Sequence, residues 1–183
     1  MKVSYGISNT HYAIIDPSTG RYRTPGALPG AVSFGISGGG KELSVKSNFG
    51  TLPIKRQRDD YSGILVIASL PLAFLSDVFG IVVDAHGVEI DYGIEDVIHF
   101  ALMYENNTDV GRIRQVWYDC TAELPEYSVQ TNDTGITIAT RQLDIKMRKN
   151  PALELRGYPS PIKARVASDK AAFNTFFDEV YGV

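Results

Sequence analysis

Apolar and polar residues alternate along most of this chain, which is the pattern of strands with one buried face. In the clearest example, residues 116–124, the apolar face holds Cys120 and the other face holds Trp117. We expect Trp117, the only tryptophan, on the side of this strand that contacts other elements. Turn-forming residues separate further predicted strands at 12–15, 31–37, 42–46, 61–69, 81–83, 88–90, 99–105 and 136–147.

Helical spacing is found in two places. Residues 71–79 begin with a proline suited to the first helical turn and end before Gly80, a suitable C′ residue. Leu72, Leu75 and Phe79 would close one end of the core. A second helix is predicted after Ser168, a plausible N-cap, and carries apolar residues at Phe173, Phe176, Phe177, Val180 and Tyr181.

Many short strands with too few helices for crossovers predict a mainly β fold. We expect an antiparallel sandwich or barrel with one short internal helix and a C-terminal helix. A chain of 183 residues is long enough for one domain, which we expect over residues 1–183. Two stretches are harder to assign. Residues 46–60 form a long exposed loop or an extended hairpin, and residues 148–183 form an arm, which leaves the domain or wraps over it, followed by the final helix.

Composition narrows the class of protein. The chain is 44% hydrophobic and 21% charged, lacks an apolar run near the roughly 20 residues of a membrane span, and begins without a secretion signal. We therefore expect a soluble protein of cytoplasmic synthesis without a membrane partner. The single cysteine excludes an internal disulfide. The formal charge of −3 argues against a surface that neutralises many phosphates.

One glycine-rich stretch raises the possibility of a nucleotide site. Residues 35–41, GISGGGK, match the first half of a phosphate-binding loop. The position after Lys41 is Glu42, where such a loop needs Ser or Thr for Mg²⁺, and a strand-like stretch follows instead of a helix. We therefore interpret the stretch as a hairpin turn between two strands.

Other catalytic patterns are missing as well. The three histidines have no zinc-binding spacing, and there is no G-x-S-x-G motif. Cys120 on an apolar face indicates a buried hydrophobe, and Asp84 with His86 indicates turn chemistry. We predict no catalytic, cofactor-binding or metal-binding residue, and we expect that the protein is not an enzyme.

Five segments, in order and spacing, resemble the major tail proteins of long-tailed, siphovirus-type bacteriophages, which are the subunits of the tail tube. The segments are 24–33 (TPGALPGAVS), 61–71 (YSGILVIASLP) leading into 74–80 (FLSDVFG), the turn at 84–88, 100–105 (FALMYE) and 111–122 (GRIRQVWYDCTA). The amphipathic end at 177–181 is also similar. The resemblance is best over residues 10–147.

The resemblance implies a β-sandwich subunit of hexameric rings that stack into a tube, the conduit for DNA ejection. A long loop would reach the neighbouring ring, and terminal arms would add contacts. DNA would pass through an acidic lumen without specific binding. Partners would be further copies, the tape measure and the tail terminator, and the location would be the virion tail. The family brings no catalytic residues and no cofactor.

The basic stretch at 46–60 could dock on an acidic surface of the next ring, or it could be a solvated loop. The three phenylalanines near the C-terminus could cover their own subunit's core, which is the commoner arrangement, or contact a partner. The candidate ring–ring or subunit contacts are Lys46, Phe49, Lys55, Arg56, Arg58, Trp117, Phe173 and Phe176.

Three other functions are compatible with the pattern. A β-sandwich module that binds a ligand or carbohydrate would suit the ten tyrosines. A neck or tail-completion protein of the same virion would make one ring and stop. A hydrolase is the weakest alternative because no nucleophile and base are paired.

Overall fold

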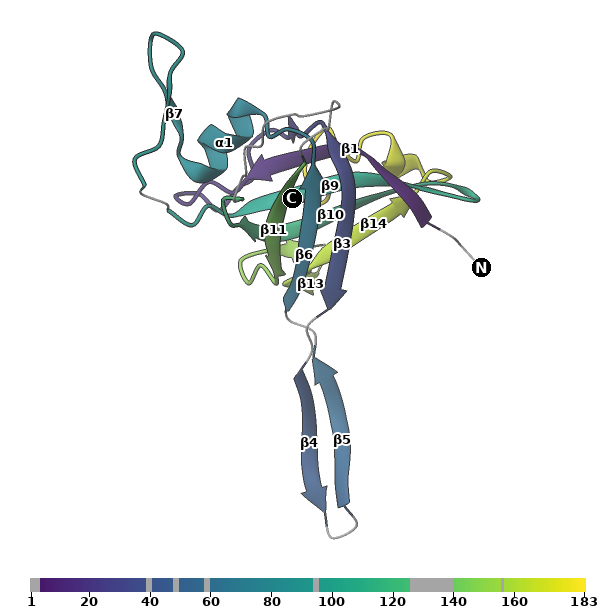
Figure 1. Cartoon of the computed structure of the whole chain (residues 1–183). Helices are drawn as coiled ribbons and strands as arrows, with labels where there is room; N and C mark the ends of the chain where they lie inside the picture. The colour runs from purple at the N-terminus through teal and green to yellow at the C-terminus, as the bar shows by residue number, and fades with distance from the viewer. Residues whose placement is uncertain are drawn as a thin grey trace, which may run out of the picture.

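The computed structural model describes residues 4–38, 41–47, 50–57, 60–93, 96–125, 140–155 and 157–183. The protein is mainly β, as predicted, and an eight-stranded antiparallel sheet dominates it (Figure 1). The strand order is β2-β1-β9-β10-β11-β6-β3, and β14 pairs with β10 outside this order. The bounds are β1 Ser4–Ile14, β2 Gly26–Ala27, β3 Ala31–Gly38, β6 Asp60–Ile67, β9 Phe100–Thr108, β10 Gly111–Ala122, β11 Arg141–Arg148 and β14 Lys163–Ala167.

Three two-stranded sheets complete the described strands. They are β4 (Lys41–Ser47) with β5 (Gly50–Gln57), β7 (Val82–Val83) with β8 (Glu89–Ile90), and β12 (Glu154–Leu155) with β13 (Tyr158–Pro159). The strand predicted at 136–147 corresponds to β11, and its first residues lie outside the described residues.

The main sheet curls around its core. Although β1 and β3 are far apart in the strand order, they come into contact without a hydrogen-bonded ladder. The first core cluster lies within this curl and includes Leu65, Phe74, Phe100 and Trp117. A second cluster forms where the C-terminal segment packs against β9 and β10, and it includes Met103, Val116, Tyr118, Phe176 and Val180.

Strand β10 is buried on both faces, which corrects the predicted alternation. The β9–β10 ladder shifts between Trp117 and Cys120, so these two residues belong to the same core cluster. Val116 and Tyr118 belong to the other cluster. A β-bulge of this kind adds a residue to one strand and changes which face the following side chains occupy.

The internal helix is confirmed. Helix α1 (Leu72–Phe79) follows Pro71 and ends at Gly80, whose φ of 69° is the left-handed conformation that glycine adopts readily. Phe74, Leu75, Val78 and Phe79 are buried against the first cluster. Leu72, predicted in the core, is 40% exposed.

The prediction of a hairpin turn in the glycine-rich stretch at residues 35–41 is wrong. Strand β3 pairs with β6, and β4 pairs with β5, so β3 and β4 are not partners. The β4–β5 pair instead lies between β3 and β6 in the sequence, so the β3–β6 pair encloses it. Alternation identifies strands, but it does not identify which strands pair.

The predicted C-terminal helix is also wrong. Ala171–Phe173 form a single 3-10 turn, and turns continue through Gly182. The backbone bonds span three residues, as from the N–H of Phe176 to the carbonyl of Phe173. Arg114 donates to the carbonyls of Phe173 (2.5 Å) and Asn174 (3.3 Å), which diverts acceptors that an α-helix would use. The preceding arm returns to the domain, where β14 joins the main sheet beside β10.

Candidate assembly surfaces

The β4–β5 hairpin projects away from the body of the protein (Figure 1). In the described part of the chain, its two strands pair only with each other. The register shifts between Leu43 and Ser44, next to Pro53 on the partner strand. Proline is tolerated there because an edge strand has no second ladder for a missing N–H to break. The predicted loop at 46–60 is therefore largely an extended hairpin, the alternative left open above.

The hairpin is basic. Its described residues hold Lys41, Lys46, Lys55 and Arg56 against one acid, Glu42. In the backbone register, Lys46 is opposite Thr51 and Arg56 is opposite Glu42. Two further predicted contact residues, Phe49 and Arg58, lie outside the described residues.

Strand β3 has a hydrogen-bonded ladder on one edge, while on its other side it contacts β1 without a ladder. It pairs with β6 on one side, and no other described strand forms a ladder with it. Val32 and Ile36 on this strand are 57% and 40% exposed. An edge without a ladder offers unpaired N–H and C=O groups to a strand of another chain wherever β1 does not cover it.

A shallow groove lies over the β3, β6 and β11 side of the sheet. Small residues provide its floor along β3, where Gly35 is opposite Ile64 and Ser37 is opposite Ser62. Lys146 at its rim donates to Glu123, and this hydrogen bond lowers the pKa of the Glu123 carboxyl. The groove is lined by Gly35, Ile36, Ser37, Ser62, Gly63, Ile64, Glu123, Asp144, Ile145 and Lys146.

Trp117, predicted to face a contact surface, is fully buried. Its indole N–H donates to the Tyr104 hydroxyl at 3.3 Å, and its ring meets that of Tyr61 with centroids 5.0 Å apart. The ammonium of Lys163 lies 4.7 Å from the indole centroid. Trp117 therefore has no accessible surface to present to a partner in this structure.

Phe173 and Phe176 also lie in the core of their own subunit. They are 3% and 1% exposed, which agrees with the commoner of the two arrangements considered from the sequence. The guanidinium of Arg114 lies 4.2 Å from the Phe173 ring centroid and 4.5 Å from that of Phe177. These contacts fasten the C-terminal segment to β10.

A buried carboxylate anchors the arginines that hold this segment. The Glu105 side chain is 5% exposed, and its two oxygens accept from Arg112 Nη1 at 3.2 Å and Arg114 Nε at 3.0 Å. A buried charge needs such partners because burial removes its hydration. This cluster was not predicted from the sequence, because Glu105 ends the predicted strand at 99–105 whereas Arg112 and Arg114 lie before the predicted strand at 116–124.

The possible reactive residues named in the sequence analysis are a turn residue, a buried core residue and the first residue of a strand. Asp84 Oδ1 accepts from the backbone N–H groups of His86 and Val88 at 2.8 and 2.9 Å, as turn chemistry requires. Cys120 is fully buried, and burial raises the pKa of its thiol. Lys41 opens a strand and no helix follows it, which contradicts a phosphate-binding loop.

One polar pair lies at a pocket without reactive neighbours. His99 Nδ1 and Asp119 Oδ1 are 2.6 Å apart. Among the described residues, the pocket beside them includes no Ser, Thr, Cys or Lys; it is lined by Ile15, Pro17, Val97, Ile98, His99, Asp119 and Asn150.

Within the described ranges, no group of three or more His, Cys, Asp or Glu could hold a metal ion. No helix in these ranges is long and apolar enough to cross a membrane.

Comparison with known proteins gives only distant similarity. No protein-family model matches the chain, and no curated protein matches it. Among solved structures, the chain is similar to the anti-feeding prophage cap, a tube terminating cap (TM-score 0.40, 11% identity, 91% of this chain and 94% of that chain). It is also similar to a chain of the sheath–tube complex of an extracellular contractile injection system in the extended state (TM-score 0.40, 12% identity, 89% and 93%). A third is the sheath/tube terminator of such a system (TM-score 0.38, 11% identity, 90% and 99%). Similarity at this level does not establish a shared function.

Proposed function

We propose that this protein is a structural subunit of a phage tail tube, which assembles through its β4–β5 hairpin into stacked rings. The observation that carries the proposal is the hairpin itself. It extends from the body, and within the described residues its strands pair with no other strand. A two-stranded hairpin is marginally stable at best in water, so one of this length is best explained by a surface on another chain.

The edge of β3 that has no ladder supports lateral assembly. A strand that is paired on one side only can extend the sheet of a neighbouring copy, which closes a ring when the rotation suits. In the proposed assembly six copies form each ring, stacked rings form a tube, and the chain forms one domain with the hairpin as its extension. Other tail proteins, the tape measure and the terminator, meet this tube in the virion.

The proposed conduit must let DNA pass without gripping it. The formal charge of −3 suits this role, because a surface that released many counterions on binding DNA would retard its passage. The basic residues of the hairpin are compatible with a smooth lumen if they are covered at the contact between rings.

The test is assembly of the purified protein over a concentration series, followed by light scattering and negative-stain electron microscopy. We expect rings that stack into tubes. A variant in which a short Gly-Ser turn replaces residues 41–57 should keep its fold, because the β3–β6 ladder remains, and should form single rings at most. Single rings from the wild type would favour a neck or tail-completion protein, and normal tubes from the shortened variant would refute the hairpin's role.

A further inference from the structure

A second projection lies at the other end of the molecule. We call residues 82–93 with 96–97 the acidic finger; it holds the β7–β8 hairpin, and it is the extension labelled β7 in Figure 1. The finger leaves the body after Ile81 and returns at Ile98, and both residues pack against the first core cluster. Its turn is fixed by Asp84, whose carboxylate accepts the N–H groups of His86 and Val88. The finger therefore has a regular β-hairpin with a hydrogen-bonded turn.

The finger exposes apolar side chains that the body does not cover. Val88, Tyr92 and Val97 are 53%, 64% and 72% exposed, and Val82 and Val83 on β7 are exposed as well. Five large apolar side chains in one short projection are an unusual concentration for a surface that meets only water. The finger thus has the apolar component of a binding surface.

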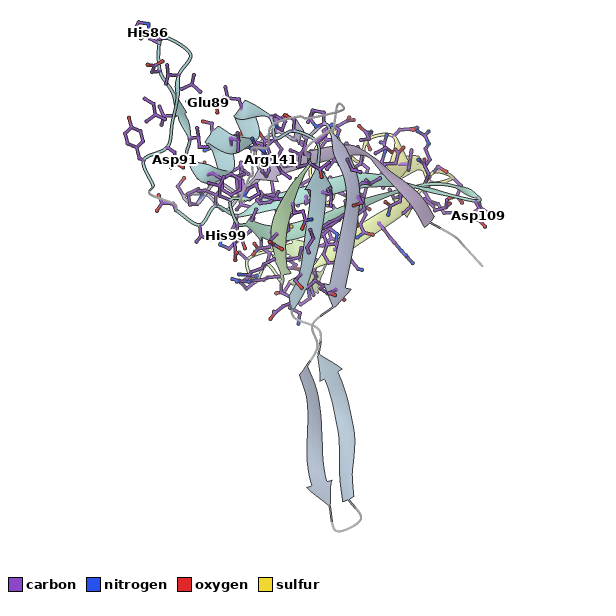
Figure 2. The ribbon with its side chains drawn as sticks, viewed as in Figure 1. His86, Glu89, Asp91, His99, Asp109 and Arg141 are labelled. Atoms are coloured by element: carbon purple, nitrogen blue, oxygen red, sulfur yellow. The ribbon has the colours of Figure 1, made fainter. Side chains whose placement is uncertain are left out.

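The finger is also strongly acidic. No lysine or arginine occurs between Arg58 and Arg112, so the finger has no cation of its own. Figure 2 shows His86 at its tip and Glu89 and Asp91 along it, far from the β4–β5 hairpin. The acids of the finger in the described residues are Asp84, Glu89, Asp91 and Asp96.

The two projections of one chain are complementary in composition. The β4–β5 hairpin combines its cations with the apolar residues Leu43, Val45, Leu52 and Ile54, and the finger combines apolar residues with acids. They lie at opposite ends of the molecule, so they cannot meet within one copy. Oppositely charged surfaces steer association and fix its orientation, and apolar burial supplies affinity.

We propose that the acidic finger of one copy binds the β4–β5 hairpin of a second copy. This inference rests on the proposed function and deepens it, because it names the surface that receives the hairpin. The contact joins two different surfaces of the same chain. Repeating such a head-to-tail contact yields an open stack, and the first and last copies each keep one projection unoccupied.

Two charge-reversed variants test the pairing. Glu89→Lys with Asp91→Lys and Asp96→Lys makes the finger basic, because Asp84 alone then remains as an acid among its described residues, and Lys55→Glu with Arg56→Glu makes the hairpin acidic. Each variant alone should need a concentration at least about tenfold higher than the wild type for half-maximal stacking, because its two projections then carry like charges. Mixed in equal amounts, the two should stack again, because the basic finger of one then meets the acidic hairpin of the other.

The matched control for the finger variant is Asp109→Lys with Glu154→Lys and Glu179→Lys, which changes the net charge by the same amount at exposed sites outside both projections. It should stack like the wild type. Circular dichroism confirms that each variant is folded, and sedimentation velocity with electron microscopy measures stacking. If the wild type stacks and both reversed variants stack as well as it does, or fail to recover on mixing, the pairing is refuted and the proposed function stands. If the wild type remains monomeric throughout, both are refuted.

Discussion

Replacing Arg114 by methionine should release the C-terminal segment and destabilise the protein strongly. Arg114 is 14% exposed, and it connects three groups that are distant in the sequence. Its Nε binds the buried carboxylate of Glu105 at 3.0 Å, and its Nη1 donates to the carbonyls of Phe173 and Asn174. Its guanidinium also stacks on Phe173 and Phe177. Methionine keeps most of the side-chain volume and loses all of these polar contacts.

The magnitude follows from what remains after the substitution. Breaking a buried ion pair from one side costs about 3–5 kcal/mol. Arg112 still contacts the other oxygen of Glu105, which favours the lower end of that range. The two carbonyl hydrogen bonds from a charged donor add roughly 1–2 kcal/mol, after a discount for their partial exposure. We expect a loss of about 4 kcal/mol, a large part of the 5–15 kcal/mol typical of a folded domain.

Equilibrium unfolding in urea measures this loss. With a slope of about 2 kcal/mol per molar urea, the midpoint should fall by about 2 M. Limited proteolysis should show earlier cleavage after residue 168, because the C-terminal segment loses its fastening to β10. The two assays together separate a released segment from a general loss of stability.

Arg112→Met is the matched control. It removes the same charge from the same strand and contacts the same carboxylate at 3.2 Å, but the Arg112 side chain is 57% exposed. Exposed ion pairs contribute about 1 kcal/mol at most, so this variant should stay close to the wild type. Equal losses in the two variants, or a loss under about 1 kcal/mol for Arg114→Met, would refute the role assigned to burial.

The elements that could be predicted from the sequence depend on neighbouring residues. The alternation at 61–67 matches β6, in which Leu65 and Ile67 are buried and Ile64 is exposed. Proline and glycine mark the two ends of α1 because each acts on the backbone where it stands. The same holds for the turn at Asp84, whose side chain bonds to groups two and four residues away.

The failures concern groups that are distant in the sequence. The pairing of β3 with β6 leaves no mark in the alternation of either strand. The bulge after Trp117 arises in the β9–β10 ladder, so residues 116–124 alone cannot reveal it. At the C-terminus, Phe173 and Phe176 are both buried, as in the commoner of the two arrangements considered from the sequence, but Arg114 binds the carbonyls that a helix would need.

The candidate assembly surfaces were predicted only in part. The cations of 46–60 stand out in the sequence, and a docking role for them stays a prediction. The sequence divided the acidic finger between two predicted strands, at 81–83 and 88–90, and a turn. Its significance depends on where the structure puts it: exposed, acidic, and at the end of the molecule opposite the basic hairpin.

Two further predictions probe the core. Burial raises the pKa of Tyr104 to about 12, so its neutral form is favoured by folding: stability should hold below about pH 10 and decline as pH rises towards 12. Burial also raises the pKa values of Tyr12, Tyr22 and Tyr118, so Tyr104→Phe should reduce this decline without abolishing it. Urea midpoints between about pH 8 and pH 11 measure the slope, which is superimposed on a constant cost from the lost Trp117 hydrogen bond; an unchanged slope would contradict the prediction. At Gly63, an added Cβ would lie 2.9 Å from the Gly35 carbonyl oxygen and 2.7 Å from the Phe34 ring, whereas a Cβ at Gly35 meets nothing within 4 Å. Gly63→Ala should therefore lower the free energy of unfolding by about 1–3 kcal/mol, because the added methyl group forces β3 away from β6. Gly35→Ala should lower it by less than about 0.5 kcal/mol. Equal thermal midpoints for the two variants would refute the close approach of β3 and β6 at Gly63.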